Sequence, residues 1–300
     1  MKDQAEQLRH IVARLKQRNR DRGNARIITI TSGKGGVGKT SLTTNLGISL
    51  AQMGYRVIII DGDFGLANID LMLGMASRYG LREMILGQMD VNEVILEGPS
   101  GIKFISGGSG IRELINLGSH QMDVFLEKID KLNDMADIVL IDTGAGASDN
   151  VVKMALAAHE IVLVVTPEPT AITDAYALTK IITSIRQDVD LRLIINRVQS
   201  MTEAEDILDK FTKTVYRFLG ITVEALGSVN DDIHVPKSIR EQIPYIVSYP
   251  NCRASRQVGY IAKKLTEQNN EVRRDNQGLV SYFRRLLDFF NFKDRQEDIL

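Results

Sequence analysis

The sequence predicts an α/β protein built on a doubly wound, mostly parallel sheet. Strand-like and helix-like segments alternate from residue 26 onward, a pattern typical of parallel strands joined by crossover helices. The strand centres are continuous apolar runs such as VIIID, IVLID, IVLVV and LIIN, as expected for strands that helices cover on both faces. With 300 residues, of which 44% are hydrophobic and 25% charged, the chain can bury a sizeable core.

The predicted elements form a single domain with separate terminal segments. Strands are expected at 26–32, 56–61, 102–106, 137–142, 160–166, 191–196 and 223–228. Helices are expected at 3–18, 40–53, 119–133, 149–157, 170–186, 202–219, 253–266 and 279–291. The chain therefore divides into a basic N-terminal segment with a linker (1–25), the α/β domain (26–267), a polar tether (268–277), an amphipathic helix (278–292) and a tail (293–300).

Charge and cysteine content exclude several classes of protein. Lys+Arg 37 against Asp+Glu 38 gives a net charge of −1, so bulk positive charge does not draw the whole chain to nucleic acid. The single cysteine, Cys252, excludes an internal disulfide and an all-cysteine metal cluster within one chain. There is no apolar signal segment and no apolar run of 18 residues, which predicts a cytoplasmic protein.

A glycine-rich loop follows the first predicted strand. Residues 33–40 read GKGGVGKT, which matches G-x-x-x-x-G-K-[ST] with the required strand before it and helix after it. Backbone N–H groups of such a loop enclose phosphate oxygens, while Lys39 is expected to neutralise phosphate charge and Thr40 to bind Mg²⁺. The expected nucleotide contacts in this region are Gly33, Lys34, Gly35, Gly36, Val37, Gly38, Lys39, Thr40 and Ser41.

This loop resembles the deviant Walker A loop of the MinD/ParA class of P-loop ATPases, the SIMIBI type. The resemblance implies ATP or ADP with Mg²⁺ as ligands. It also implies a homodimer that encloses ATP between its subunits, in which Lys34 reaches the partner's nucleotide and acts in catalysis beside Lys39.

Acidic residues end two of the predicted strands. Asp61 and Asp63 follow one strand and Asp142 ends another, at the sheet edge where phosphates would lie. The class pattern gives Asp63 the water-positioning role and places Asp61 and Asp142 near the metal, through water. Gly144, Ala145 and Gly146 resemble the switch II segment that senses the γ-phosphate.

Asn196 and Arg197 end a further strand, where this class carries its base-reading asparagine. Guanine-specific loops have an aspartate two residues later, whereas Val198 follows here. The segment therefore favours adenine, and a strand-capping asparagine is the alternative interpretation.

Residues 279–291 form a helix with an apolar and a polar half when placed at about 100° per residue. Phe292 falls on the polar side, so the helix is expected to end before it. Such a helix on a polar tether can bind an anionic membrane surface, and two in a dimer would gain avidity. The alternatives are a helix packed permanently on its own domain, or one docked in the monomer and released on dimerisation. The predicted membrane contacts are Leu279, Val280, Tyr282, Phe283, Leu286, Leu287, Phe289 and Phe290.

Four segments extend the resemblance over nearly the whole chain. The opening DQAEQLR, the GKGGVGKT loop, DGDFGLANID at 61–70 and TPEPTAITDAY at 166–176 together are similar to the FlhG family, also called YlxH or FleN. Its members are MinD-like ATPases that regulate flagellar number and placement. The resemblance implies slow ATP hydrolysis, contact with flagellar C-ring switch proteins, and stimulation of an FlhF-type GTPase through Gln4.

The leading hypothesis is an ATP-driven dimerising switch, cytoplasmic and peripherally attached to the inner face of the cell membrane in its ATP state. A ParA-type DNA-partitioning ATPase is the alternative, because residues 1–26 carry a net charge of about +5 that could contact phosphates. The Phe-rich C-terminal helix has no use in that role, so DNA is not the expected partner. A metal-cluster carrier on this fold would need two cysteines per monomer, and this hypothesis is therefore nearly excluded.

Overall fold

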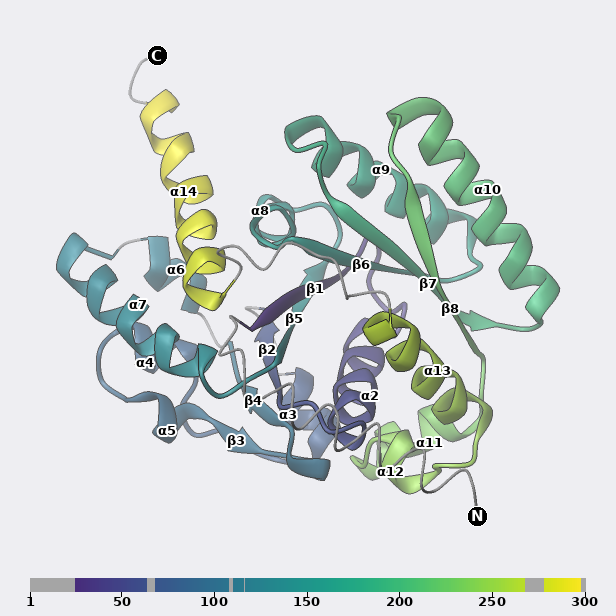
Figure 1. The fold of residues 1–300 in the computed structure, drawn as a ribbon, viewed down its shortest axis with the longest axis horizontal. Helices are drawn as coiled ribbons and strands as arrows, with labels where there is room; N and C mark the ends of the chain where they lie inside the picture. Colours follow the sequence, from purple (N-terminus) through teal and green to yellow (C-terminus); the bar gives the residue numbers. More distant parts are fainter. Residues whose placement is uncertain (1–24, 64–67, 108–109, 116, 268–277, 298–300) are drawn as a thin grey trace.

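A computed structural model describes residues 25–63, 68–107, 110–115, 117–267 and 278–297. Eight strands form one twisted sheet in the order β3-β4-β2-β5-β1-β6-β7-β8, and only β3 runs antiparallel to its neighbour (Figure 1). The predicted doubly wound, mostly parallel α/β fold is therefore confirmed. The strands are β1 (Arg26–Ser32), β2 (Val57–Gly62), β3 (Leu96–Glu97), β4 (Lys103–Ile105), β5 (Ile138–Ala145), β6 (Glu160–Val165), β7 (Asp190–Val198) and β8 (Val223–Asn230).

Helices cover both faces of the sheet. Alternate residues of β1, β2 and β5 enter two separate apolar clusters, one that includes α2 and α13 and another that includes α7 and α14. None of the described helices is long and apolar enough to cross a membrane. The longer helices are α2 (Lys39–Gln52), α7 (Ser119–Asn133), α8 (Asp149–Ala157), α9 (Pro169–Ile185), α10 (Met201–Leu219), α11 (His234–Glu241), α13 (Arg253–Glu267) and α14 (Leu279–Glu297).

Several short helices and one short strand were not predicted from the sequence. Each spans only two to six residues, too few for a hydrophobic period to be recognised. The predicted helix 3–18 and the tether 268–277 lie outside the described residues. The short elements are α3 (Asn68–Leu73), α4 (Leu81–Ile85), α5 (Val91–Val94), β3, η1 (Pro99–Gly101), α6 (Gly110–Ile115) and α12 (Tyr245–Ser248), and the eight-residue α11 was also missed.

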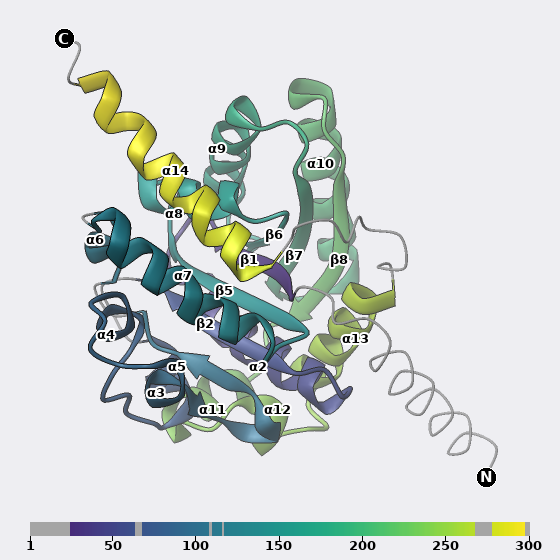
Figure 2. The same ribbon diagram turned by 60° about the vertical axis from the view of Figure 1, so that its left-hand side comes forward.

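The C-terminal helix α14 docks against α7 and α8 and runs longer than predicted (Figure 2). It continues to Glu297, so the expected end before Phe292 was wrong. The following residues, KDRQE at 293–297, include good helix formers and no Gly or Pro, which lets the helix extend past its apolar face.

The apolar face of α14 belongs to the core in this structure. The ring of Phe283 meets Phe125 edge-on, with centroids 5.2 Å apart, and Tyr282 donates a hydrogen bond to the Met154 carbonyl at 3.2 Å. Val280 and Phe289 are only partly buried. The docked arrangement considered above is thus the one present here. The buried residues of this face are Leu279, Tyr282, Phe283, Leu286, Leu287 and Phe290.

Asn133 joins the two ends of the described domain. Its Oδ1 accepts hydrogen bonds from the backbone N–H of Ala25 at 3.0 Å and of Leu279 at 3.3 Å. Ala25 precedes β1 and Leu279 begins α14. The N-terminal segment and the tether therefore both connect to the domain beside this one side chain.

An ion-pair network holds β1, β6 and β7 together at the edge of the sheet opposite the glycine-rich loop. Glu160, 2% exposed, accepts a bidentate pair from Arg26 and lies 3.5 Å from Arg192 Nη2. Arg192 also donates to Asp190 at 2.8 Å. Removing any single member of such a buried network destabilises the fold, because the remaining charges would be uncompensated.

We expect Glu160→Ala to lower the free energy of unfolding by about 3–5 kcal/mol, because it leaves two arginines without their buried partner. The control is Asp188→Ala, which removes an ion pair to Arg186 from a carboxylate that is 90% exposed and should cost less than about 1 kcal/mol. Urea unfolding measures both, and equal losses would contradict the network's role.

Candidate nucleotide-binding site

The glycine-rich loop lies between β1 and α2 with a backbone that requires glycine. Gly36 and Gly38 have positive φ values of 78° and 85°, a conformation that costs other residues strain. A Cβ on Gly33 would lie 2.3 Å from the backbone carbon of Asp174 in α9. The loop is therefore packed tightly on α9 at its start and turned by two left-handed glycines, which suits it to enclose an anion at the N-terminus of α2.

Asp142, within β5, organises the groups beneath the loop. This carboxylate is fully buried. It lies 3.0 Å from Lys39 Nζ and accepts hydrogen bonds from the Thr40 hydroxyl at 2.6 Å and the Thr43 hydroxyl at 2.9 Å. Lys39 also donates to the carbonyl of Thr143. Thr40 and Asp142, the predicted metal-binding residues, are thus in direct contact with each other. Both lie beside Lys39, the residue predicted to bind phosphate.

Asp61 faces Asp142 across paired strands, in register with it. Burial and the neighbouring carboxylate of Asp142 raise the pKa of Asp61 to about 7, although the N–H groups of Asp63 and Ile69 lower it. Two buried carboxyl groups and a hydroxyl are oxygen donors of the kind that Mg²⁺ prefers. A divalent cation would supply the positive charge that this pair needs, so the residues fit the metal.

Asp63 and the predicted switch II segment adjoin one another. A Cβ on Gly144 would lie 3.6 Å from Asp63 Oδ1. Two residues on, the N–H of Gly146 donates to the Ser32 carbonyl at 2.9 Å, and Ala145 ends β5. The structure thereby brings the predicted water-positioning residue beside the segment predicted to sense phosphate.

Lys34 lies apart from Lys39, on the exposed side of the loop. Its Nζ donates to Glu168 at 2.7 Å and to the Thr170 hydroxyl at 2.9 Å. The hydrogen bond from Lys34 lowers the pKa of Glu168. Sequence reasoning missed both partners, although they lie within the TPEPTAITDAY segment that carried the resemblance.

Asn196 contacts the loop itself. Its Nδ2 donates to the Val37 carbonyl at 2.7 Å, and a Cβ on Gly38 would lie 2.6 Å from the same nitrogen. Arg197 has a left-handed φ of 62° and lies 3.6 Å from Asp231. The structure therefore places Asn196 beside the end of the loop, whereas the ion pair of Arg197 is with Asp231.

Ser41 is the remaining loop contact. Its hydroxyl is buried without a hydrogen-bond partner among the described residues, as expected of a donor placed for a phosphate oxygen. Gln4, predicted to act on a partner, lies outside the described residues.

Several known proteins are similar to this chain over most of its length. A ParA family model, described as NUBPL iron-transfer P-loop NTPase, matches residues 24–266. The antiactivator FleN of Pseudomonas aeruginosa is 35% identical over 80% of this chain and 85% of its own length. The flagellum site-determining protein YlxH of Helicobacter pylori is 32% identical over 90% and 92%. The structure of MinD complexed with Mg-ADP from Pyrococcus horikoshii superimposes with a TM-score of 0.64 at 25% identity, covering 81% of this chain and 96% of its own.

The fold, the glycine-rich loop and the buried Lys39–Asp142 pair define a P-loop NTPase of the MinD/ParA class. Within that class, the chain belongs to the FleN/YlxH (FlhG) family. The resemblance read from the sequence is thereby confirmed.

Two glycine variants test the loop geometry. Gly36→Ala should cost about 1–2 kcal/mol of unfolding free energy, because its φ is left-handed but its surroundings are open. Gly33→Ala should cost about 3 kcal/mol or more, because its methyl group would overlap the α9 backbone. Urea unfolding provides the comparison, and a Gly33 variant as stable as the Gly36 variant would disprove the close packing on α9.

Proposed function

We propose that the protein is an ATP-dependent dimerising switch that hydrolyses ATP slowly, associates with the membrane and regulates flagellar number or placement. The observation that carries the proposal is the buried Lys39–Asp142 pair, hydrogen-bonded to the partly buried Thr40, directly beneath a phosphate-type loop. A second observation supports the membrane role: an amphipathic helix packed on the same domain.

Each residue of the site has a chemical role in this proposal. The loop N–H groups and Lys39 bind the phosphates, and Asn196 with Arg197 borders the adenine. Thr40 would hold Mg²⁺, with Asp61 and Asp142 acting through its water ligands; the ion would supply positive charge against the phosphate oxygens. Asp63, beside Gly144, orients the attacking water and accepts a proton from it.

Lys34 supplies positive charge to the nucleotide of a second subunit. Its pairing with Glu168 and Thr170 is exposed, with 38% of the Lys34 side chain and 55% of Glu168 accessible. An exposed ion pair contributes little, so exchanging it for a partner's phosphate costs little. We propose that this exchange accompanies ATP-driven dimerisation.

Lys34→Ala should therefore bind ATP as a monomer while its hydrolysis falls by roughly 10²–10³-fold, the cost of removing one charge donor from a transition state. Lys39→Ala should lose nucleotide binding itself. Lys180→Ala, an exposed lysine of α9, is the matched control. Equilibrium binding and steady-state hydrolysis separate the three variants, and full activity in Lys34→Ala would refute its role in the dimer.

Release of α14 would couple nucleotide state to the membrane. The six buried residues of its apolar face cannot contact lipid while docked on α7 and α8. In the released helix they would form an apolar surface that lies in a membrane interface. Two such helices in one dimer bind with avidity that a monomer lacks. The protein would thus be cytoplasmic when monomeric and peripheral on the inner membrane face when ATP-bound.

Asp63→Ala should accumulate the ATP dimer, because loss of the water-positioning carboxylate slows hydrolysis by roughly 10²–10⁴-fold. We expect this variant to sediment with anionic liposomes in ATP and to remain in the supernatant in ADP. Phe289→Asp, a change at a partly buried position of the same apolar face, should weaken sedimentation while the dimer persists in size-exclusion chromatography. Equal sedimentation of Asp63→Ala in ATP, of Asp63→Ala in ADP and of the helix variant would show that the nucleotide does not control membrane binding by α14.

The flagellar role extends what the relatives' names state. The antiactivator FleN and the flagellum site-determining protein YlxH support a regulator that acts through partners. We propose two partners: flagellar C-ring switch proteins, and an FlhF-type GTPase contacted by the N-terminal segment. An uncharged glutamine can orient the attacking water in a GTPase site, which is the role proposed for Gln4.

Gln4→Ala should accordingly lose the stimulation of FlhF GTP hydrolysis without changing the protein's own ATP hydrolysis. Gln7→Ala, three residues along the same segment, serves as the matched control. GTP turnover by purified FlhF measures both. Stimulation that survives in Gln4→Ala at the wild-type level would disprove the assignment of this residue.

A further inference from the structure

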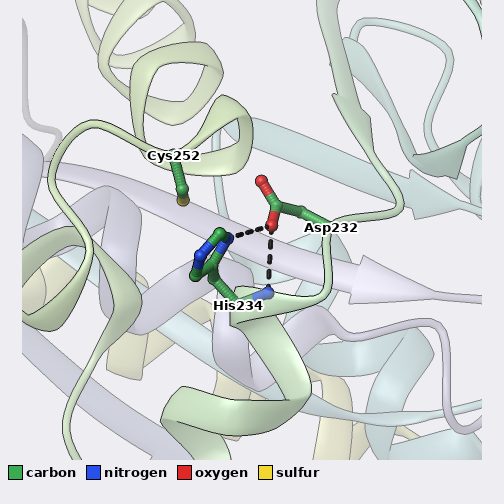
Figure 3. A group of neighbouring side chains, drawn as sticks. All are labelled: Asp232, His234 and Cys252. Carbon is green, nitrogen blue, oxygen red and sulfur yellow. Dashed lines mark hydrogen bonds and ion pairs between the residues drawn. The ribbon is translucent and has the colours of Figure 1, made fainter.

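Three side chains of different chemistry meet beyond the carboxyl end of β8 (Figure 3). Asp232 and His234 lie at the start of α11, and Cys252 directly precedes α13. One potential ligand atom from each residue lies within 4.8 Å of the other two. The nucleotide site described above uses none of the three.

Hydrogen bonds hold all three residues in place. The Cys252 sulfur accepts the backbone N–H of Ser255 at 3.4 Å and lies 3.2 Å from the Ser255 hydroxyl. Asp232 Oδ1 lies 2.7 Å from His234 Nδ1 and accepts the backbone N–H of His234 at 3.0 Å, while Oδ2 accepts that of Ala254 at 3.3 Å. The imidazole packs on Tyr249, with ring centroids 4.8 Å apart. Tyr249 is itself held by Glu241 at 2.8 Å. A ligand arriving here would meet an acid and an imidazole that are already ordered.

We propose that Asp232, His234 and Cys252 bind a transition-metal cation of the zinc class. A thiolate, an imidazole and a carboxylate are the three ligand types that Zn²⁺ takes in proteins, whereas Mg²⁺ and Ca²⁺ prefer oxygen alone. Ligand bonds of about 2.0–2.3 Å place the atoms of a tetrahedral site roughly 3–4 Å apart. One potential ligand atom from each of the three residues already lies within 4.8 Å of the other two, which is close to these separations.

The proton balance of binding is simple. The Cys252 thiol loses its S–H proton to solvent as the sulfur–metal bond forms, while a ring nitrogen of His234 and a carboxylate oxygen of Asp232 contribute lone pairs. The thiol thus releases one proton for each ion bound. Because the His234 side chain is 38% exposed, the fourth position can be taken by water.

A metal here would join two segments that are distant in sequence. It would tie the segment between β8 and α11 to the start of α13. The residue before Asp232 is Asp231, which lies 3.6 Å from Arg197. The proposed ion would thus stiffen the chain next to the end of β7, independently of whether ATP or another nucleotide binds there.

Cobalt titration of the full-length, untagged and chelator-treated protein tests the proposal. Since the chain has one cysteine, a thiolate-to-cobalt charge-transfer band can arise only from Cys252. We expect this band to saturate at one Co²⁺ per chain with release of one proton, and added Zn²⁺ to remove it. Cys252→Ser should abolish the band, and His234→Ala should weaken binding by at least about tenfold. His120→Ala, an exposed histidine outside the cluster, should leave binding unchanged.

Two outcomes would overturn the site. The first is a folded wild-type protein, judged by circular dichroism, that shows no thiolate band at saturating Co²⁺. The second is a Cys252→Ser protein with wild-type metal affinity and stoichiometry, which would place the ion on other residues. Because the wild-type titration decides the first outcome, the test does not depend on the stability of any variant.

Discussion

The carboxylate of Asp142 is the constraint on which the site depends. It is fully buried, and an ionised carboxylate away from water is tolerated only when charged and hydroxyl donors surround it. Lys39, Thr40 and Thr43 are those donors, and all three lie on the first turns of α2. Satisfying this one acid of β5 therefore fixes where α2 begins and where the glycine-rich loop must turn. The placement of β5 between β2 and β1 brings Asp61 into register on the adjoining strand.

A second constraint acts on the opposite face of the sheet, where α14 completes an apolar cluster with α7. The phenylalanine and leucine side chains that suit a membrane interface are equally suited to a protein core, because both remove apolar surface from water. Docking on the domain and the proposed membrane binding would therefore use the same helix face and exclude one another. Asn133 accepts hydrogen bonds from both Ala25 and Leu279, so undocking would also disturb the point at which the N-terminal segment joins the domain.

Much of the fold was predictable because its signals are local. The helices α7, α8, α10 and α13 agree with prediction to within one residue at each end, because helical periods span enough residues to be recognised. The long parallel strands lie where their apolar runs predicted them, although β5, β7 and β8 continue two or three residues beyond the predicted ends. The short elements, including the antiparallel β3, depend on contacts with distant segments instead. The end of α14 was predicted wrongly for a different reason. The amphipathic pattern ends before Phe292, but the residues that follow favour a helix, and the helix continues to Glu297.

The sequence by itself determined the phosphate-type loop, the acids at the strand ends and the amphipathic character of the C-terminal helix. In each case the chemistry is encoded in neighbouring residues, so no distant contact is needed to recognise it. Only the tertiary structure decided which groups meet across the chain: Lys34 with Glu168, Asn196 with the Val37 carbonyl, and α14 with α7. The cluster at the start of α11 and α13 belongs to this second kind. Such pairings follow from strand order and helix packing, which bring residues more than a hundred positions apart into contact and leave no periodic signal in the sequence.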